Sequence, residues 1–128
     1  MISQIKKIFK SDQEDRKKLK NGEMVWVEVI KNDSLRREKI LEVIKKNKNK
    51  LSESDCFYAA IPFHHSHNVA HLKIALKLAK ESVIRGHKRG KKLMMAIEDR
   101  LCLAKGISQK HGTQSLIRNG KLVKCKKE

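Results

Sequence analysis

Two long helical patterns separated by a short turn constrain the fold of this chain more than any other feature. The first covers residues 69–85, where apolar side chains recur at helical spacing; Asn68 can cap its start and Gly86 follows its end. The second covers residues 91–105 and is apolar on almost all sides, which is typical of a helix at the centre of a domain. The basic segment 86–92 between them is long enough only for a turn. The sequence therefore predicts an αα-hairpin at the centre of the fold.

The N-terminal segment 2–20 has the spacing of an amphipathic helix that ends at Asn21-Gly22. Its apolar stripe contains two charged residues, Asp12 and Arg16, one helical turn apart. Opposite charges on a buried face are either a satisfied structural pair or part of a site. The spacing alone leaves both interpretations open.

The middle of the chain predicts further helices and contains one ambiguous stretch. Residues 24–30 alternate in a way that suits a short strand, although a helical turn has the same length. We expect the next helix to be capped by Asp33 or Ser34, and the one after it by Ser52 or Asp55. The expected buried face of the earlier helix consists of Leu35, Ile40, Leu41 and Ile44.

The C-terminal part changes from helical to turn-forming sequence. Residues 109–114 form a polar loop, and 115–123 predict a β-hairpin because Asn119-Gly120 favours a type I′ turn. The predicted fold is mainly α: a small bundle of four or five helices with a central αα-hairpin and a short C-terminal β-hairpin. We expect a single helical domain over residues 1–124, followed by a basic C-terminal tail at 125–128.

The charge of the chain points to a polyanionic partner. Lysine and arginine outnumber the acidic residues by 31 to 14, which gives a net charge of +17. Nucleic acid and phosphorylated ligands are therefore candidate partners, although lysine-rich composition on solvated faces would give the same charge. Three cysteines without a C-x-x-C pair favour reduced thiols and a cytoplasmic location. No signal peptide and no membrane span are expected, so no membrane partner is predicted.

Four histidines lie close together after Pro62, which is expected to kink or end its helix. They are His64, His65, His67 and His71. Two of them at H-x-H or one-turn spacing would supply two metal ligands, but the chain lacks H-E-x-x-H and paired cysteines. We therefore predict no metal site and no cofactor.

The order of the polar blocks resembles a bacterial family of unknown function over about residues 10–118. The blocks are Asp12-Gln13-Glu14-Asp15-Arg16; Asp33 with Arg36; Ala59-Ala60-Ile61-Pro62-Phe63-His64-His65-Ser66; Ala75 with Leu78-Ala79; Asp99-Arg100; and Gly106, Gln109 and Gly112-Thr113-Gln114. The last block, G-x-x-Q-x-x-G-T-Q, is the most specific. The resemblance implies a helical fold and a shared set of polar residues, and it implies no reaction.

These polar residues form the candidate site. Histidine side chains can transfer protons near neutral pH, and Asp99 or Asp12 would orient His65, so the catalytic candidates are His65 and Asp99. Arginines bind phosphates or carboxylates by paired donors, whereas amides and hydroxyls read a sugar or a base edge. The ligand-binding candidates are Asp12, Arg16, Arg100, Gln109, Thr113 and Gln114.

The leading hypothesis is therefore a polar pocket that binds a phosphorylated or nucleotide-like ligand; whether the chain also hydrolyses it, as an enzyme, stays open. A structural interpretation competes with it: Asp12–Arg16 and Asp99–Arg100 would tie helices together, and the glutamines would satisfy loop backbone. Two further alternatives are a non-catalytic nucleic-acid-binding module with Lys-rich surfaces and a helical protein-interaction domain. The oligomeric state is left open.

Overall fold

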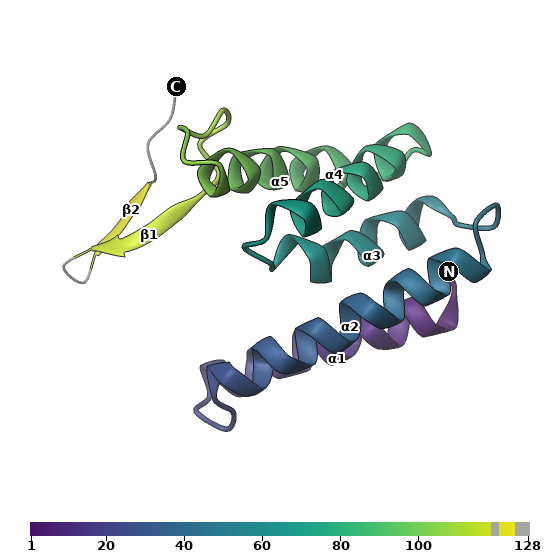
Figure 1. Ribbon diagram of the computed structural model, residues 1–128, viewed down its shortest axis with the longest axis horizontal. Coiled ribbons are helices and arrows are strands. Elements are labelled where there is room, and N and C mark those ends of the chain that lie inside the picture. Colours follow the sequence, from purple (N-terminus) through teal and green to yellow (C-terminus); the bar gives the residue numbers. More distant parts are fainter. Residues whose placement is uncertain (119–120, 125–128) are drawn as a thin grey trace.

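The computed structural model describes residues 1–118 and 121–124. Five helices and two strands lie in this part of the chain (Figure 1). The helices are α1 (Ser3–Lys20), α2 (Trp26–Lys46), α3 (Glu53–His64), α4 (Val69–Ile84) and α5 (Gly90–Ala104). The strands are β1 (Ser115–Arg118) and β2 (Lys121–Lys124). The prediction of a mainly helical bundle is confirmed.

The strands β1 and β2 pair antiparallel, with Ser115 opposite Lys124 and Arg118 opposite Lys121. The Asn119-Gly120 turn predicted between them lies outside the described residues, as does the basic tail predicted at 125–128. The type I′ turn and the tail therefore stay predictions.

Helix α3 occupies the centre of the bundle. It packs against each of the other four helices, whereas α5 contacts only α3 and α4 among the described elements. Figure 1 shows α3 between a layer of α1 and α2 and a layer of α4 and α5. The predicted αα-hairpin of α4 and α5 exists, but the prediction that it is central is wrong. The reason is that α3 buries residues on several sides, including Phe57, Ala59, Ala60 and Phe63, while several apolar residues of α5 are only half-buried.

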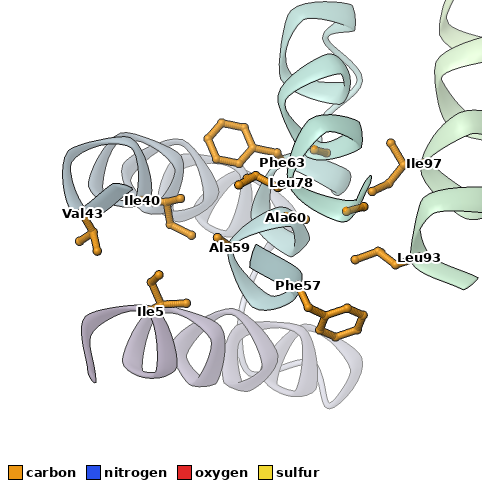
Figure 2. Close-up of a cluster of buried hydrophobic side chains, with 12 residues drawn as sticks. Ile5, Ile40, Val43, Phe57, Ala59, Ala60, Phe63, Leu78, Leu93 and Ile97 are labelled. Carbon is orange, nitrogen blue, oxygen red and sulfur yellow. The ribbon is translucent and has the colours of Figure 1, made fainter. Parts of the chain in front are cut away.

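One hydrophobic core joins all five helices (Figure 2). Its members are Ile5 from α1; Ile40 and Val43 from α2; Phe57, Ala59, Ala60 and Phe63 from α3; Ala75, Leu78 and Ala79 from α4; and Leu93 and Ile97 from α5. Close packing of α4 on α5 depends on Gly90, because a Cβ atom there would lie 2.6 Å from Ser82 Oγ. Burial of these side chains is the main force that holds the helices together.

Helix α2 begins earlier than the sequence predicts. Residues 26–30 form its first turn, so the expected cap at Asp33 or Ser34 is wrong. Asp33 lies inside the helix and is buried with Arg36, and this face turns Leu35 and Leu41 outward, where they are exposed. The predicted burial of those two leucines is therefore also wrong, whereas Ile40 is buried and Ile44 half-buried.

The predicted caps of the next two helices are confirmed. Ser52 caps α3 in a capping box: its Oγ accepts from the Asp55 backbone N–H, and Asp55 accepts from the Ser52 backbone N–H. Asn68 caps α4 by accepting from the backbone N–H groups of Ala70 and His71. Pro62 stands near the end of α3, which stops two residues later at His64. These ends place the chain turn 65–67 between α3 and α4.

In the described part of the chain, no helix combines the length and the apolar character that a membrane span requires.

Candidate functional site

Five charged side chains form a closed network between α1 and α2: Asp12, Asp15, Arg16, Asp33 and Arg36. Arg16 donates to both carboxylate oxygens of Asp33, at 3.0 and 2.7 Å, and lies 3.3 Å from Asp12 Oδ1. Arg36 donates to Asp33 Oδ1 at 2.8 Å and also pairs with Asp15. Arg16 is half-buried and the other four are buried. Such paired, hydrogen-bonded charges can be held in an interior because each guanidinium faces carboxylates.

The electrostatics of this network favour the charged forms of Asp15, Arg16 and Asp33. Burial alone would raise the pKa of Asp33, but hydrogen bonds and charge from Arg16 and Arg36 hold it below its usual range. The pKa of Asp15 is lowered in the same way by Arg36 and Asn32, against the effect of burial. Burial alone would lower the pKa of Arg16, but Asp33 and Asp12 hold it above its usual range. The contacts of Asp12 and Arg16 thus favour a structural role for that pair.

His65 joins this network from the end of α3. Its Nε2 lies 3.2 Å from Asp12 Oδ1, and its Nδ1 has no hydrogen-bond partner among the described residues. The second oxygen of Asp12, Oδ2, is buried and makes no hydrogen bond in that part of the chain. Asp12 therefore orients His65, and no hydrogen bond among the described residues links His65 to Asp99. The structure does not bring the two catalytic candidates together.

Asp99 instead holds the loop that follows α5. Its Oδ1 accepts from the backbone N–H groups of Lys110 and His111, both at 2.7 Å. Its Oδ2 accepts from the Thr113 backbone N–H at 2.9 Å and from Thr113 Oγ1 at 2.6 Å. Burial would raise the pKa of Asp99, but the hydrogen bonds from Thr113, His111 and Lys110 hold it below its usual range. With four donors on its two oxygens, this carboxylate fixes the shape of the loop.

The two glutamines of the last block also act on this loop. Gln109 is fully buried; its Oε1 accepts from the Gln114 backbone N–H at 2.9 Å and its Nε2 donates to the Gln114 carbonyl at 3.2 Å. The Gln114 side chain donates to Thr113 Oγ1 at 3.0 Å. The amide of Gln109 thus imitates a strand partner for the backbone of Gln114. The interpretation that Gln109 satisfies loop backbone is confirmed.

Arg100 and Arg37 lack such carboxylate partners. Arg100 Nη2 makes long contacts with the carbonyl oxygens of His65 (3.4 Å) and Ser66 (3.3 Å), and Arg37 Nη1 contacts the Pro62 carbonyl at 3.4 Å. In residues 1–118 and 121–124, no carboxylate oxygen lies within 4 Å of either guanidinium. An Asp99–Arg100 pair therefore does not form, because these neighbours on α5 point in different directions.

The charge of Arg16 acts on both Arg37 and Arg100, the two arginines that contact residues 62–66. Burial lowers the pKa of Arg100, and the charge of Arg16 lowers it further. Burial also lowers the pKa of Arg37; the charge of Asp33 opposes this effect and the charge of Arg16 adds to it. Arginine stays protonated at neutral pH despite such shifts. The region therefore holds positive charge that nearby carboxylates do not fully neutralise.

Two pockets open on either side of the chain turn 65–67. The larger, of about 290 Å³, is lined by Arg100 and Gln114 among other residues. The smaller, of about 160 Å³, is lined by Arg37 and His65 among others. Residues 66–67 line both pockets, so the two are adjacent. Each pocket thus presents one arginine that has no carboxylate partner in the described part of the chain.

His64 is half-buried at the end of α3 and is neutral at physiological pH. Burial, together with the charge of Arg100 and of His65, lowers the pKa of His64 to about 3. Its Nδ1 atom is buried and has no hydrogen-bond partner among the described residues. A neutral His64 therefore adds no positive charge beside Arg100.

Of the predicted site residues, His65, Arg100 and Gln114 line the pockets. Asp12 and Arg16 lie in the network, whereas Asp99, Gln109 and Thr113 support the loop. Sequence reasoning missed Arg37 and Trp26, both of which line the smaller pocket. The available signal was the spacing of residues 26, 30, 33 and 37, which is one face of a helix. Because the helix was expected to begin at Asp33 or Ser34, residues 26 and 30 were not expected to belong to that face.

The histidines do not form a metal site with other residues of the described chain. No group of three or more His, Cys, Asp or Glu side chains in that part is arranged to hold a metal ion. His71 Nδ1 lies 2.7 Å from Ser66 Oγ, which also accepts from the Asn68 backbone N–H. His67 is exposed. The contacts of His71 thus stabilise the start of α4.

Comparisons with protein-family models, with curated proteins and with solved structures find no match for this chain. The resemblance to a bacterial family therefore stays an expectation based on the motif blocks. The function has to be argued from the geometry of the two pockets.

Proposed function

We propose that this chain binds a phosphorylated or nucleotide-like ligand in the two pockets beside residues 65–67. One observation carries the proposal: Arg37 and Arg100 are half-buried, each lines a pocket, and neither has a carboxylate within 4 Å among the described residues. A planar guanidinium binds phosphate or carboxylate oxygens by paired hydrogen bonds. An anionic ligand would supply the partner that the folded chain does not.

The cost of this arrangement supports a functional role. Removing a charge from water without a compensating partner destabilises a protein. Selection for stability alone would therefore pair such a side chain with an opposite charge or replace it by an apolar one. Arg16 and Arg36, by contrast, are both paired with carboxylates in this chain. Two arginines without such partners beside pockets are typical of a binding site, where stability is commonly sacrificed.

We assign separate roles to the residues of the loop after α5. Gln114 lines the larger pocket, and its amide is suited to a hydroxyl or a base edge of the ligand. Gln109, Thr113 and Asp99 hold the backbone around Gln114 and are therefore positioning residues. This assignment replaces the predicted catalytic role of Asp99.

Isothermal titration calorimetry with pyrophosphate and ADP tests the binding proposal. Arg100→Gln and Arg37→Gln should each weaken binding about ten- to hundred-fold, because a charged hydrogen bond contributes roughly 1.5–3 kcal/mol. Lys92→Gln, an exposed change on the same helix as Arg100, is the control and should leave the affinity unchanged. The proposal fails if neither compound binds the parent, or if both arginine variants bind as the parent does.

If the site is catalytic, we propose His65 as the general base and Asp12 as the residue that orients it. The support is the 3.2 Å contact between His65 Nε2 and Asp12 Oδ1, together with the place of His65 in the lining of the smaller pocket. His65→Ala should then lower phosphate release from ADP by about 10²–10⁴-fold and leave binding within a few fold. Equal turnover in the variant would remove the catalytic role and leave the binding proposal intact.

Membership in the bacterial family that the motif blocks resemble, and a cytoplasmic location, are also part of the proposal. Cys56 and Cys102 are buried free cysteines, as expected where thiols stay reduced. We further propose that Asn119-Gly120 closes β1 and β2 into a hairpin. These statements add no reaction to the binding function.

The exposed lysines of α1 favour a second candidate function, nucleic-acid binding. They are Lys6, Lys7, Lys10, Lys17, Lys18 and Lys20, in a chain of net charge +17. A surface that neutralises many phosphates releases counterions, so its affinity falls steeply with salt. A steep dependence of binding to single-stranded DNA on salt concentration supports this candidate, whereas a flat one rules out extensive phosphate contacts.

A further inference from the structure

One face of α2 changes from apolar to cationic along the smaller pocket. Trp26, Ile30, Asp33 and Arg37 follow one another at intervals of four, three and four residues, and all four line that pocket. Asp33 is occupied by Arg16 and Arg36, so its charge is already matched. The two residues at the ends of this row, Trp26 and Arg37, therefore remain to contact a ligand.

Trp26 is unusually available for a large aromatic side chain. It is 51% exposed at the first residue of α2 and packs against no ring and no cation among the described residues. Ile30, one turn further along, is also 51% exposed. A bare phosphate or pyrophosphate would gain nothing from this apolar surface. A planar aromatic group would gain both burial and stacking.

The dimensions favour a ligand longer than an inorganic anion. The larger pocket, of about 290 Å³, is close to the roughly 300 Å³ at which small-molecule sites begin, and the smaller pocket adjoins it at residues 66–67. Trp26 and Arg37 are eleven positions apart on α2, about 16 Å along its axis. A ligand that contacts both needs a flat apolar end, a spacer and an anionic end.

We infer that the ligand of this site is a nucleoside phosphate, with its base stacked on Trp26 and its phosphates bound by Arg37 and Arg100. The inference rests on the proposed function and adds the chemical class of the ligand to it. The sugar is the spacer between the indole and the guanidinium groups. Gln114 in the adjoining pocket provides an amide for the remaining polar groups of the ligand.

The chain carries its own probe for this inference, because Trp26 is its single tryptophan. We would titrate the parent with ADP, pyrophosphate and ribose 5-phosphate, and follow both indole fluorescence and heat. The indole is excited at the red edge of its absorption, where the base does not absorb. ADP should quench the fluorescence over the same concentration range in which heat is released. Pyrophosphate should bind at least about ten-fold more weakly and leave the emission nearly unchanged.

Two variants separate stacking from a general effect on α2. Trp26→Leu should weaken ADP binding about ten-fold or more and leave pyrophosphate binding unchanged, because only the base loses its contact. Val27→Ala is the matched control: Val27 is the next residue, is 75% exposed and does not line the pocket. It should bind both compounds as the parent does. Circular dichroism of each variant checks that the helices are intact.

The outcomes distinguish this inference from the proposed function. If ADP and pyrophosphate bind the parent equally and Trp26→Leu changes neither, the nucleoside part is wrong and phosphate binding stands. Equal loss of both compounds in Trp26→Leu also overturns stacking. If neither compound binds the parent, the proposed function fails and this inference fails with it.

A nucleoside phosphate reaches the site either free or as the end of a nucleic-acid strand, and both sources share the same chemistry. A short 5′-phosphorylated single strand, titrated beside ADP, separates them. Quenching by ADP at the lower concentration supports a free nucleotide. Quenching by the strand at the lower concentration supports a strand end as the ligand. The lysines of α1 would then contact the remaining nucleotides of the strand. Absence of quenching by both overturns the inference.

Discussion

The arginines of α1, α2 and α5 are held in two contrasting ways. Arg36 is enclosed by the carboxylates of Asp15 and Asp33, and further donates to the Ser11 backbone carbonyl at 3.0 Å. Arg37, the next residue, lines a pocket and, among the described residues, reaches only the Pro62 carbonyl. Arg16 and Arg100 repeat the contrast, one bidentate on Asp33 and the other on backbone carbonyls alone among the described residues.

The contrast separates two uses of the same side chain. A guanidinium enclosed by carboxylates has its charge matched by them, so its role is to join helices. A guanidinium that faces a pocket keeps its donors available, and its burial is a cost to the fold. Adjacent residues on one helix can thus serve stability and binding separately. The difference is open to test by identical substitutions at both positions.

The largest effect is expected at the paired arginine. Arg36→Gln leaves the buried carboxylates of Asp15 and Asp33 short of a partner, and should lower the free energy of unfolding by about 3–5 kcal/mol. Urea denaturation followed by circular dichroism measures this loss. Lys39→Gln, an exposed change on the same helix, should alter stability by less than about 0.5 kcal/mol. A loss below about 1 kcal/mol for Arg36→Gln would show that the network does not hold α1 to α2.

Sequence reasoning found the helices and part of this network, because both leave local signals. The 3,4 spacing of α1 placed Asp12 and Arg16 on its apolar face, and the caps at Ser52 and Asn68 follow from their side-chain chemistry. The local signals did not show that Asp33 is a second carboxylate partner of Arg16. An aspartate before a helical pattern is typical of a cap, and only the contact with Arg16 on another helix shows that Asp33 has a different role.

The pockets were harder to predict because no local pattern encodes them. Arg100 was expected beside Asp99, but neighbours on a helix point about 100° apart, so one meets the loop and the other meets residues 65–66. The role of Trp26 depends on where α2 begins and on where α3 ends. Such relations between segments arise from packing.

The loop after α5 provides the next largest effect. Asp99→Asn replaces an acceptor oxygen by an amide that faces backbone donors, and should lower stability by about 2–3 kcal/mol. Hydrogen exchange of the Lys110, His111 and Thr113 amides should become faster. Lys92→Gln, an exposed change on the same helix, should leave this exchange unchanged. Unchanged protection in Asp99→Asn would show that the carboxylate does not fix the loop beside the larger pocket.

A pH dependence follows from His64, whose pKa the charge of Arg100 helps to lower. Its pKa is about 3 in the folded chain, compared with 6.5 in the unfolded chain. Between these values the unfolded chain binds a proton that the folded chain does not, so stability is lost as the pH falls below 6.5. The loss from pH 7 to pH 5 should be up to about 2 kcal/mol.

His64→Gln tests this dependence because glutamine does not titrate. Its stability should change less between pH 7 and pH 5 than that of the parent, measured by urea denaturation at each pH. The carboxylates of Asp15 and Asp33 contribute at lower pH, since their pKa values lie below 3.8 in the folded chain. His67→Gln, at an exposed position, should keep the dependence of the parent. Equal slopes in the parent and His64→Gln would assign the pH effect to other groups.

The smallest expected effect on stability completes the comparison. Arg37→Gln and Arg100→Gln should change the free energy of unfolding by less than about 1 kcal/mol, or raise it, because no carboxylate of the described chain is left without its partner. Arg37→Gln beside Arg36→Gln is the sharpest pair, since the same substitution is made at adjacent positions of α2. A loss of 3 kcal/mol or more at Arg37 would make both arginines structural and remove the argument for an anion site. Stability near that of the parent, together with weaker pyrophosphate binding, would separate the two uses of arginine within a single turn of one helix.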